Sequence, residues 1–342
     1  MPDARPIRRW LAVVAAMVFA MVVIGALTRL TESGLSMVDW RPVTGWLPPL
    51  TDTAWQAELA KYAASPQGRL VNHGITVEQF KGIFWLEYFH RLWGRLIGLA
   101  YGLPLLWFML RRGIPPGLTP HLLGLLALGG LQGLMGWLMV ASGLIDRPSV
   151  SHYRLAAHLA LAAILYAWLM ALVFRLAPAR TARPAGPGDG RVLRLTFAVI
   201  GLLAATMVWG AFVAGLRAGQ VHTTFPTMSG YWLPPGLIDT QPAWLSFVGT
   251  QTGTQFVHRL LAAATLIACL ALWWRARRDD VGAGAWPAAN MTGAMVALQF
   301  ALGVATILSG AQIALATLHQ AGAFLLLTAL TLLACRLAPP RR

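Results

Sequence analysis

Eight apolar runs, each long enough to cross a lipid bilayer, constrain the fold of this chain more than any other feature. About 20 predominantly apolar residues span the hydrocarbon core as a helix. The runs cover residues 10–30, 83–110, 118–144, 150–176, 193–216, 246–275, 288–311 and 313–337. Because a single segment satisfies its backbone groups in lipid only as a helix, the runs predict an all-α polytopic membrane protein with eight transmembrane helices.

The composition agrees with a membrane protein and argues against a soluble one. Hydrophobic residues make up 57% of the chain and charged residues 11%, whereas soluble domains carry roughly 25% charged residues. The first run follows three arginines, as in a signal peptide, but it is too long and ends without a small-residue cleavage site, so we expect it to remain as an anchor. The two cysteines, Cys269 and Cys335, lie in apolar runs, which favours buried thiols over a metal cluster or a loop disulfide.

The placement of basic residues predicts which helix ends face the cytoplasm. Five segments hold 16 of the 27 Lys and Arg residues: the amino end, 111–112, 175–194, 275–278 and the carboxy tail. Since positive residues concentrate on the cytoplasmic side, both termini are expected there. The net charge of +15 is therefore a topology signal and does not indicate a nucleic-acid site. The opposite side carries two long loops, 31–82 and 217–245.

An internal repeat divides the chain into halves of four spans each, residues 1–180 and 181–342, joined by a linker rich in Pro, Gly and Ala at 177–190. Five matches occur in the same order in both halves: Gly25-Ala26 with Gly34 and Gly210-Ala211 with Gly219, 42–49 and 226–235, 89–92 and 257–260, Leu131-Gln132 with Gly136 and Leu298-Gln299 with Gly303, and His158 and His319. Because four is an even number, the halves share one orientation and are expected to form two pseudo-symmetric four-helix bundles.

Four histidines recur in this repeat and form the candidate binding site: His90, His158, His258 and His319. At 1.5 Å per residue all four lie in the outer half of the membrane, three of them about seven to nine residues inside their spans and His258 about twelve. Within each half, the histidines of the second and fourth spans can face each other across the bundle. Two facing imidazoles are a ligand set for six-coordinate haem iron.

Three other interpretations of the histidines stay open from the residues alone. A histidine in a membrane helix can hydrogen-bond a neighbouring helix. A zinc or iron cage would need a carboxylate or thiolate as well, and Glu87 could supply one in the first half only. A proton relay also uses intramembrane His and Glu, but it does not require paired histidines at matched depth in both halves.

One acidic residue distinguishes the two halves. Glu87 lies one helical turn outward of His90, and its counterpart in the second half is Thr254 or Gln255. This asymmetry favours chemistry in the first half and a fixed electron-transfer haem in the second. The alternative is that Glu87 only pairs with Arg91 at i+4. Three arginines near the histidines are expected either to face haem propionates or to bind backbone carbonyls and Glu87: Arg91, Arg95 and Arg259.

The motifs around these residues resemble those of the heme A synthase family of respiratory membranes. The resemblance covers nearly the whole chain. It rests on TRLTESGLSM (28–37) with Trp40, EYFHRLWGR (87–95), MGW (135–137) with SGL (142–144), GAFVAG (210–215), QFVHR (255–259) and LHQ (318–320). Some bacterial members carry a cysteine pair in the outer loop, and this chain has none, so it is similar to the proteobacterial and mitochondrial type.

The resemblance implies a haem-modifying oxidoreductase that oxidises the C8 methyl of heme O to a formyl group, giving heme A for cytochrome c oxidase. In that family the carboxy-terminal histidine pair holds haem b, here His258 and His319, and the amino-terminal pair, here His90 and His158, serves the substrate haem. Glu87 matches the family's catalytic candidate. The implied partners are heme O, heme O synthase, cytochrome c oxidase assembly factors, membrane lipid and an electron donor, with quinol as one candidate. The implied location is a bacterial inner membrane, with the haem sites toward the periplasm.

Two rival functions fit the same pattern. A dihaem b-type electron carrier that oxidises quinol would use the same ligands without substrate chemistry, and it would hold two permanently bound haems of one type. A haem or small-molecule transporter would need only a parallel repeat and an axial cavity. Broken helices or a charged cluster at the membrane midplane would support the transporter, and the sequence shows neither.

Overall fold

The computed structural model describes residues 3–41, 43–145, 147–177, 186–279 and 281–339, and it contains the eight long apolar helices that the sequence predicts. They are α1 (Arg5–Leu30), α4 (Val77–Leu110), α5 (Thr119–Ala141), α6 (His152–Arg175), α7 (Asp189–Gly215), α9 (Gln251–Arg278), α10 (Trp286–Leu308) and α11 (Ile313–Leu337). Within the described residues there is no β-strand beyond one isolated bridge. The chain is therefore a multi-pass, all-helical membrane protein.

Two of the histidine-bearing helices, α4 and α9, begin well away from the starts of their apolar runs, because of their caps. α4 begins six residues before residue 83, since Thr76 and Gln79 form a capping box that carries the helix beyond the apolar run. α9 begins five residues after residue 246, since Thr250 caps it and residues 246–249 form a separate turn. His258 therefore lies seven residues inside α9, not about twelve.

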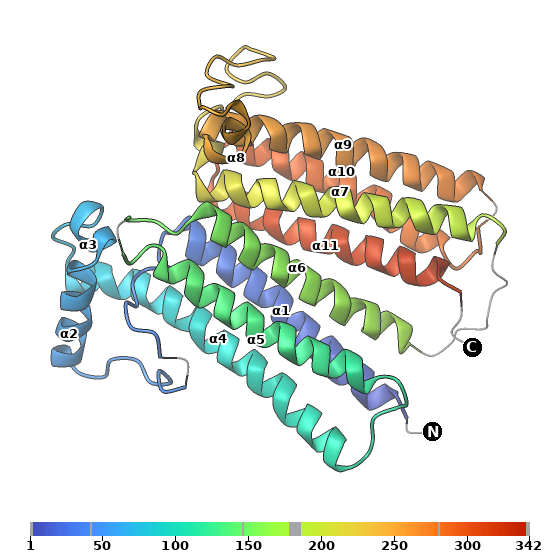
Figure 1. The fold of residues 1–342 in the computed structure, drawn as a ribbon, viewed down its shortest axis with the longest axis horizontal. Coiled ribbons are helices and arrows are strands. Elements are labelled where there is room, and N and C mark those ends of the chain that lie inside the picture. The colour runs from blue at the N-terminus through green and yellow to red at the C-terminus, as the bar shows by residue number, and fades with distance from the viewer. Residues whose placement is uncertain (1–2, 42, 146, 178–185, 280, 340–342) are drawn as a thin grey trace.

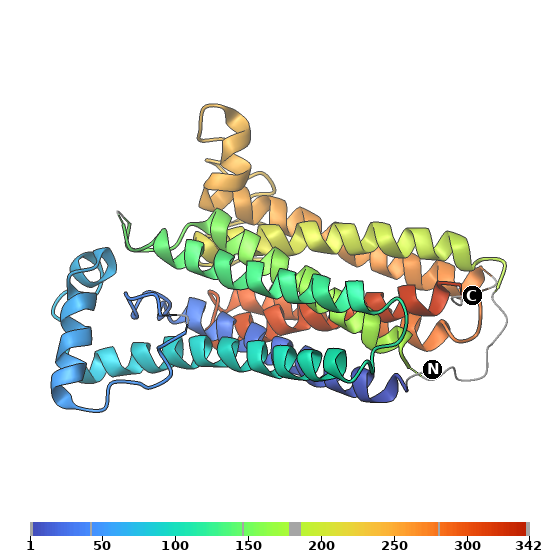
Figure 2. The same ribbon diagram turned by 60° about the horizontal axis from the view of Figure 1, so that its bottom comes forward.

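The helices form two groups of four, shown side by side in Figures 1 and 2. In the first group α1, α4, α5 and α6 contact one another in a ring, and in the second α7, α9, α10 and α11 do the same. Contacts of α6 with α7 and of α11 with α1 and α6 join the groups. One buried apolar cluster runs through both. The predicted division after residue 180 falls at 178–185, outside the described residues.

The remaining short helices belong to the two long loops. The first loop carries α2 (Asp52–Ala63) and α3 (Pro66–Leu70), and the second carries η1 (Ala218–Gln220), η2 (Ala243–Leu245) and α8 (Ser246–Gly249). Both labelled termini lie at the end of the molecule opposite these loops (Figure 1). An aromatic cluster that includes Trp55, Tyr62 and Phe80 packs α2 against the extended start of α4. The first loop is thus a small folded cap.

Polar contacts cross between the two groups near their loop ends. Arg29 of α1 donates to the carbonyls of Ala214 and Gly215 at the end of α7, at 2.9 and 3.0 Å. Just beyond these helices Glu32 and Arg217 form an ion pair of 2.5 Å. These two residues occupy aligned positions of the repeat, seven residues after Gly25 and Gly210, and both have left-handed φ angles of 59° and 53°.

Candidate haem-binding cavity

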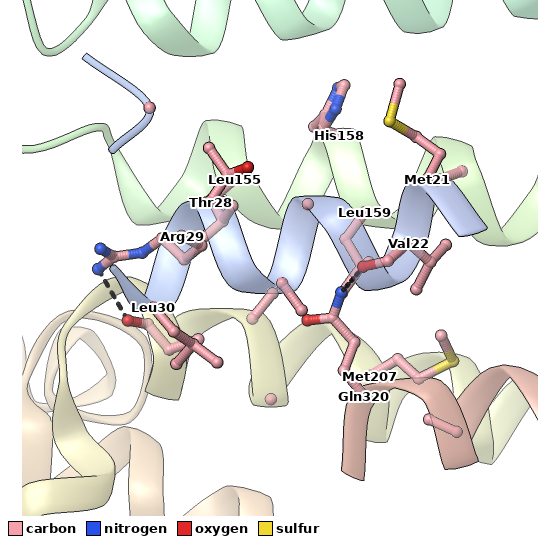
Figure 3. A pocket seen from close by; sticks show the side chains of 18 of the residues that line it. Met21, Val22, Thr28, Arg29, Leu30, Leu155, His158, Leu159, Met207 and Gln320 are labelled. Carbon is pink, nitrogen blue, oxygen red and sulfur yellow. Dashed lines mark hydrogen bonds between the residues drawn. The ribbon is translucent and has the colours of Figure 1, made fainter. Parts of the chain in front are cut away.

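A cavity of about 1190 Å³ lies within the helices and is lined by residues of both groups. All four histidines singled out from the sequence line it, and so do Glu87 and its neighbour Arg91. Figure 3 shows part of this cavity at the contact between the groups, where Gln320 of α11 donates to the carbonyl of Val22 in α1 at 3.1 Å. The two histidine pairs therefore line one internal space that both groups share.

In the second group, the rings of His258 and His319 face each other. Their centroids are 6.5 Å apart and their planes are inclined by 84°. Two metal–nitrogen bonds of about 2 Å, with about 1 Å from each nitrogen to its ring centre, require a separation of about 6 Å. His258 Nδ1 lies 3.1 Å from the carbonyl of Thr206, which can only accept, so Nδ1 carries the proton and the Nε2 lone pair remains for a metal.

In the first group, His90 has the same tautomer through a different partner. Its Nδ1 lies 3.3 Å from the Thr28 hydroxyl, whose own proton goes to the Ile24 carbonyl at 2.8 Å. The hydroxyl therefore accepts from Nδ1–H and leaves Nε2 of His90 as a potential ligand. His158 lines the same cavity as His90.

The fourth-span histidines each contact a glutamine that sequence reasoning matched in the repeat but left without a role. Gln132 Nε2 donates to the main-chain carbonyl of His158 at 3.1 Å and lies 3.3 Å from its Nε2 atom. Gln299 Nε2 donates to the main-chain carbonyl of His319 at 2.9 Å and lies 3.1 Å from its Nδ1 atom. The two glutamines thus meet different ring nitrogens, and both hold the main chain and ring of their histidine in place. Their identical spacing from Gly136 and Gly303 was the only sequence signal for them.

Each histidine also packs against a glycine of a neighbouring helix. A Cβ atom added to the glycine would lie between 2.9 and 3.4 Å from the imidazole Cε1. The pairs are Gly25 with His90, Gly136 with His158, Gly210 with His258, and Gly303 with His319. These glycines align in the repeat, so the tight ring contacts recur at matching positions of the two groups.

Glu87 is buried and its carboxylate is fully hydrogen-bonded. Oε1 accepts from Arg91 Nη2 and Nε at 2.6 and 3.1 Å, and Oε2 accepts from the Ser36 hydroxyl and the Met37 amide at 2.7 and 2.8 Å. The expected pairing with Arg91 is thus present, but the loop donors add to it. Arg91 also donates to the carbonyls of Met37 and Asp39, at 2.6 and 2.8 Å. We call this set of loop contacts the first arginine clamp.

A second arginine clamp has the same design in the other group. Arg259 donates to the carbonyls of His222 and Thr224, both at 2.8 Å, which are the loop positions that align with Met37 and Asp39. The residue aligned with Glu87 is Gln255, whose amide donates to the carbonyl of His222 at 3.0 Å. Arg91 and Arg259 therefore bind backbone carbonyls, which was one of the two arrangements expected from the sequence. Arg259 Nε and Gln255 Oε1 are buried without a hydrogen-bond partner.

The groups that line the cavity fit a haem better than a small metal cage. Among the described residues, no group of three or more His, Cys, Asp and Glu side chains could hold a metal ion. Glu87 is already engaged by four donors. His158 Nδ1 and Gln132 Oε1 are buried and unpartnered at the cavity wall, as expected if a missing group completes the site. Paired imidazoles in an apolar cavity match a bis-histidine haem.

Charged residues of the first loop lie beside the first clamp. Lys61 donates to Asp39 at 2.9 Å and Arg41 donates to it at 2.6 Å. The hydrogen bond from Lys61, with help from the Arg41 charge, lowers the pKa of Asp39 below its usual value. Hydrogen bonds to Glu58 and Asp39 in turn raise the pKa of Lys61. The second loop has the neutral Thr224 at the aligned position.

Comparisons with known proteins place the whole chain in one family. Residues 8–331 match the model of the COX15-CtaA family, described as cytochrome oxidase assembly protein. The chain is 47% identical over 332 residues to a heme A synthase of Rhodospirillum centenum, covering 97% of this chain and 88% of that protein. A heme A synthase of Nitrosospira multiformis is 43% identical over 325 residues, 95% of this chain and 91% of its own. The Arabidopsis thaliana heme A synthase COX15 is 43% identical over 333 residues, 95% of this chain and 73% of its own.

Proposed function

This chain belongs to the COX15-CtaA family of cytochrome oxidase assembly proteins, and we propose that it is a heme A synthase that oxidises the C8 methyl of heme O to a formyl group. The observation that carries this proposal is one internal cavity with two histidine pairs, of which only one has a carboxylate beside it. The product would supply heme A for cytochrome c oxidase.

The second group is the better candidate for a resident haem b. The facing rings of His258 and His319 are spaced for one iron atom. The uncompensated Arg259 beside them suits the negative charge of a haem carboxylate. A haem held there supplies one-electron transfer. Thr206 and Gln299 orient the two imidazoles, and the apolar helices around them exclude water.

The first group is the better candidate for substrate. His90 and His158 would bind the iron of heme O, and Thr28 and Gln132 would keep their rings in place. Oxidation of a methyl to a formyl group removes four electrons in two-electron steps and adds one oxygen atom, so it would require an external electron acceptor and water or dioxygen as the oxygen source. Positive charge would develop at the methyl carbon as electrons leave it. A fixed negative charge nearby stabilises that charge.

Glu87 would provide this negative charge. Its four donors occupy the acceptor sites of a carboxylate, so the group is held in one orientation. Taking up a proton would require one of these hydrogen bonds to break. Glu87 could act as a general base or as a fixed charge. The hydrogen bonds favour electrostatic stabilisation of the methyl carbon over general base catalysis.

The topology is part of the same proposal. Residues 1–180 and 181–342 would form two repeat-related units, and the matched glycine, glutamine and clamp contacts support this. The arginine-rich turns and both termini would face the cytoplasm, which places the loops and the histidine pairs toward the periplasm of a bacterial inner membrane. Heme O synthase, oxidase assembly factors and a quinol remain candidate partners.

Pigment analysis tests this function. We expect purified protein supplied with heme O to contain retained haem b together with heme O, a partly oxidised product or heme A, identified by chromatography and mass. Two equivalents of haem b that stay unchanged when heme O is supplied would identify the dihaem electron carrier instead. Protein that binds heme O reversibly but never alters it would indicate the transporter.

A further inference from the structure

The space between α4 and α5 differs from the equivalent space between α9 and α10. α4 and α5 touch at few residues, whereas α9 and α10 pack closely. Four glycines line the cavity on the facing sides of α4 and α5: Gly98, Gly129, Gly130 and Gly133. Apart from its chain neighbours and the nearby backbone of its own helix, a Cβ atom at any of them would meet no atom of the described residues within 4 Å. We call this space the glycine slot.

Helix packing does not explain these glycines. Glycine in a helix interior is destabilising relative to alanine, and in membrane helices it usually allows a second helix to approach closely. Here the space beside each glycine is open. The aligned positions in the other group carry side chains, namely Leu266, Val296, Ala297 and Phe300. Val296 is buried and Leu266 packs on the apolar core.

The cavity also reaches further along the first group than along the second. On α4 it extends to Tyr101 and on α5 to Leu125, whereas on α9 and α10 it ends at Thr265 and Val296. In the repeat alignment each difference is four residues, or about 6 Å along the axis. The same difference separates Val14 of α1 from Leu203 of α7, and Leu169 of α6 from Leu326 of α11.

The slot is continuous with an incomplete polar site. Gln132 is adjacent to Gly133 and faces His158, and both Gln132 Oε1 and His158 Nδ1 are buried without a partner. From His90 to Tyr101 the cavity spans eleven residues of α4, or about 16 Å. The ligand that completes this site therefore has a polar or metal-bearing part at the histidines and a long apolar part below them.

We propose that the glycine slot holds the farnesyl chain of the substrate haem and so determines which histidine pair accepts it. This inference rests on the proposed function. A haem bound by His90 and His158 can extend its chain between α4 and α5, where all four glycines are exposed. Leu266 and Val296 close the same path in the other group, which therefore accepts a haem without such a chain.

Variants that fill the slot with the larger side chains of the second group test this proposal. Gly98→Leu with Gly129→Val introduces the residues that the second group carries at the aligned positions. The control is Gly102→Leu, one turn further along α4, where a Cβ also meets no atom within 4 Å but the residue does not line the cavity. Each purified protein is titrated with heme O and with haem b in detergent, and its Soret absorbance is recorded. Retention of the resident haem and thermal unfolding report whether it is folded.

We expect the double variant to bind heme O at least about tenfold more weakly, from lost burial of roughly two methylene groups, with affinity for haem b unchanged. The control should match the parent protein for both haems. Equal heme O affinity in the parent and the folded double variant would overturn the proposal, as would an equal loss for both haems. Unchanged heme O affinity with loss of co-purified phospholipid would assign the slot to a lipid chain. Preferential binding of heme O without oxidation would support the slot but refute the proposed function.

Discussion

The amino-terminal and carboxy-terminal groups hold their outer loops with the same arginine clamp, but they differ in the residue beside it. Arg91 forms an ion pair with Glu87, whereas Arg259 lies next to the uncharged Gln255, and its buried Nε atom has no hydrogen-bond partner among the described residues. Because the second clamp has no carboxylate at the position of Glu87, the positive charge of Arg259 is not balanced there. The second clamp therefore holds its loop without a carboxylate, so holding the loop does not by itself explain why a glutamate lies at position 87.

The largest expected difference between the groups concerns retained haem. His258→Ala should lower the haem content of purified protein by more than about tenfold, because a resident haem loses an axial ligand. His90→Ala, at the aligned position, should leave that haem in place and abolish conversion of heme O. Haem content by pyridine haemochromogen and product identity by mass measure both effects. If the two variants lose the same haem, the assignment of the pairs is wrong.

Replacing Glu87 by glutamine separates its charge from its loop contacts. Glu87→Gln copies the residue of the second clamp, so we expect folded protein with bound haem. Loss of the fixed negative charge should reduce formation of heme A by about a hundredfold, with heme O or a partly oxidised product accumulating. Chromatography of extracted haems measures this.

Ser36→Ala is the matched control for this variant. It removes one donor to the Glu87 carboxylate and leaves the charge in place, so most activity should remain. Equal losses in Ser36→Ala and Glu87→Gln would show that Glu87 acts through the loop. Full heme A production by Glu87→Gln would remove Glu87 from the mechanism.

The smallest expected effect concerns pH and the first loop. Because Lys61 lowers the pKa of Asp39, this carboxylate stabilises the loop above its unfolded pKa of about 3.9 and loses that effect as pH falls further. Since its side chain is 40% exposed, Asp39→Asn should speed hydrogen exchange of residues 37–45 about twofold at pH 6. After correction for intrinsic rates, the variant and the parent should converge near pH 2. The second loop, with Thr224 at this position, should not respond; a parallel response there would rule out Asp39 as the cause.

The sequence alone predicts the eight helices, because a long apolar run is enough to define a helix in a membrane. It also predicts the four histidines as candidate ligands, because they recur at matching positions of the repeat. It could not predict the partners of Glu87, since Ser36 and Met37 lie about 50 residues away and reach it only once the loop folds. The starts of α4 and α9 depend on Thr76 and Thr250, whose caps are independent of the apolar pattern.

The glycine slot could not be predicted from the sequence either. Glycines such as Gly129 and Gly133 look like helix-packing residues until the distances around them are known. Only the empty space beside each one shows that no helix approaches. The aligned positions of the repeat then show how the two groups differ, because Val296 and Phe300 occupy the positions of Gly129 and Gly133.

The ion pair between Glu32 and Arg217 bears on the history of the chain. Its members occupy the same position in the two copies of the repeat, where the copies meet. Two identical copies would bring glutamate against glutamate or arginine against arginine, and like charges repel. An attractive pair can form there only when the two copies carry different residues at this position. The contact thus favours assembly of unlike halves over two identical ones.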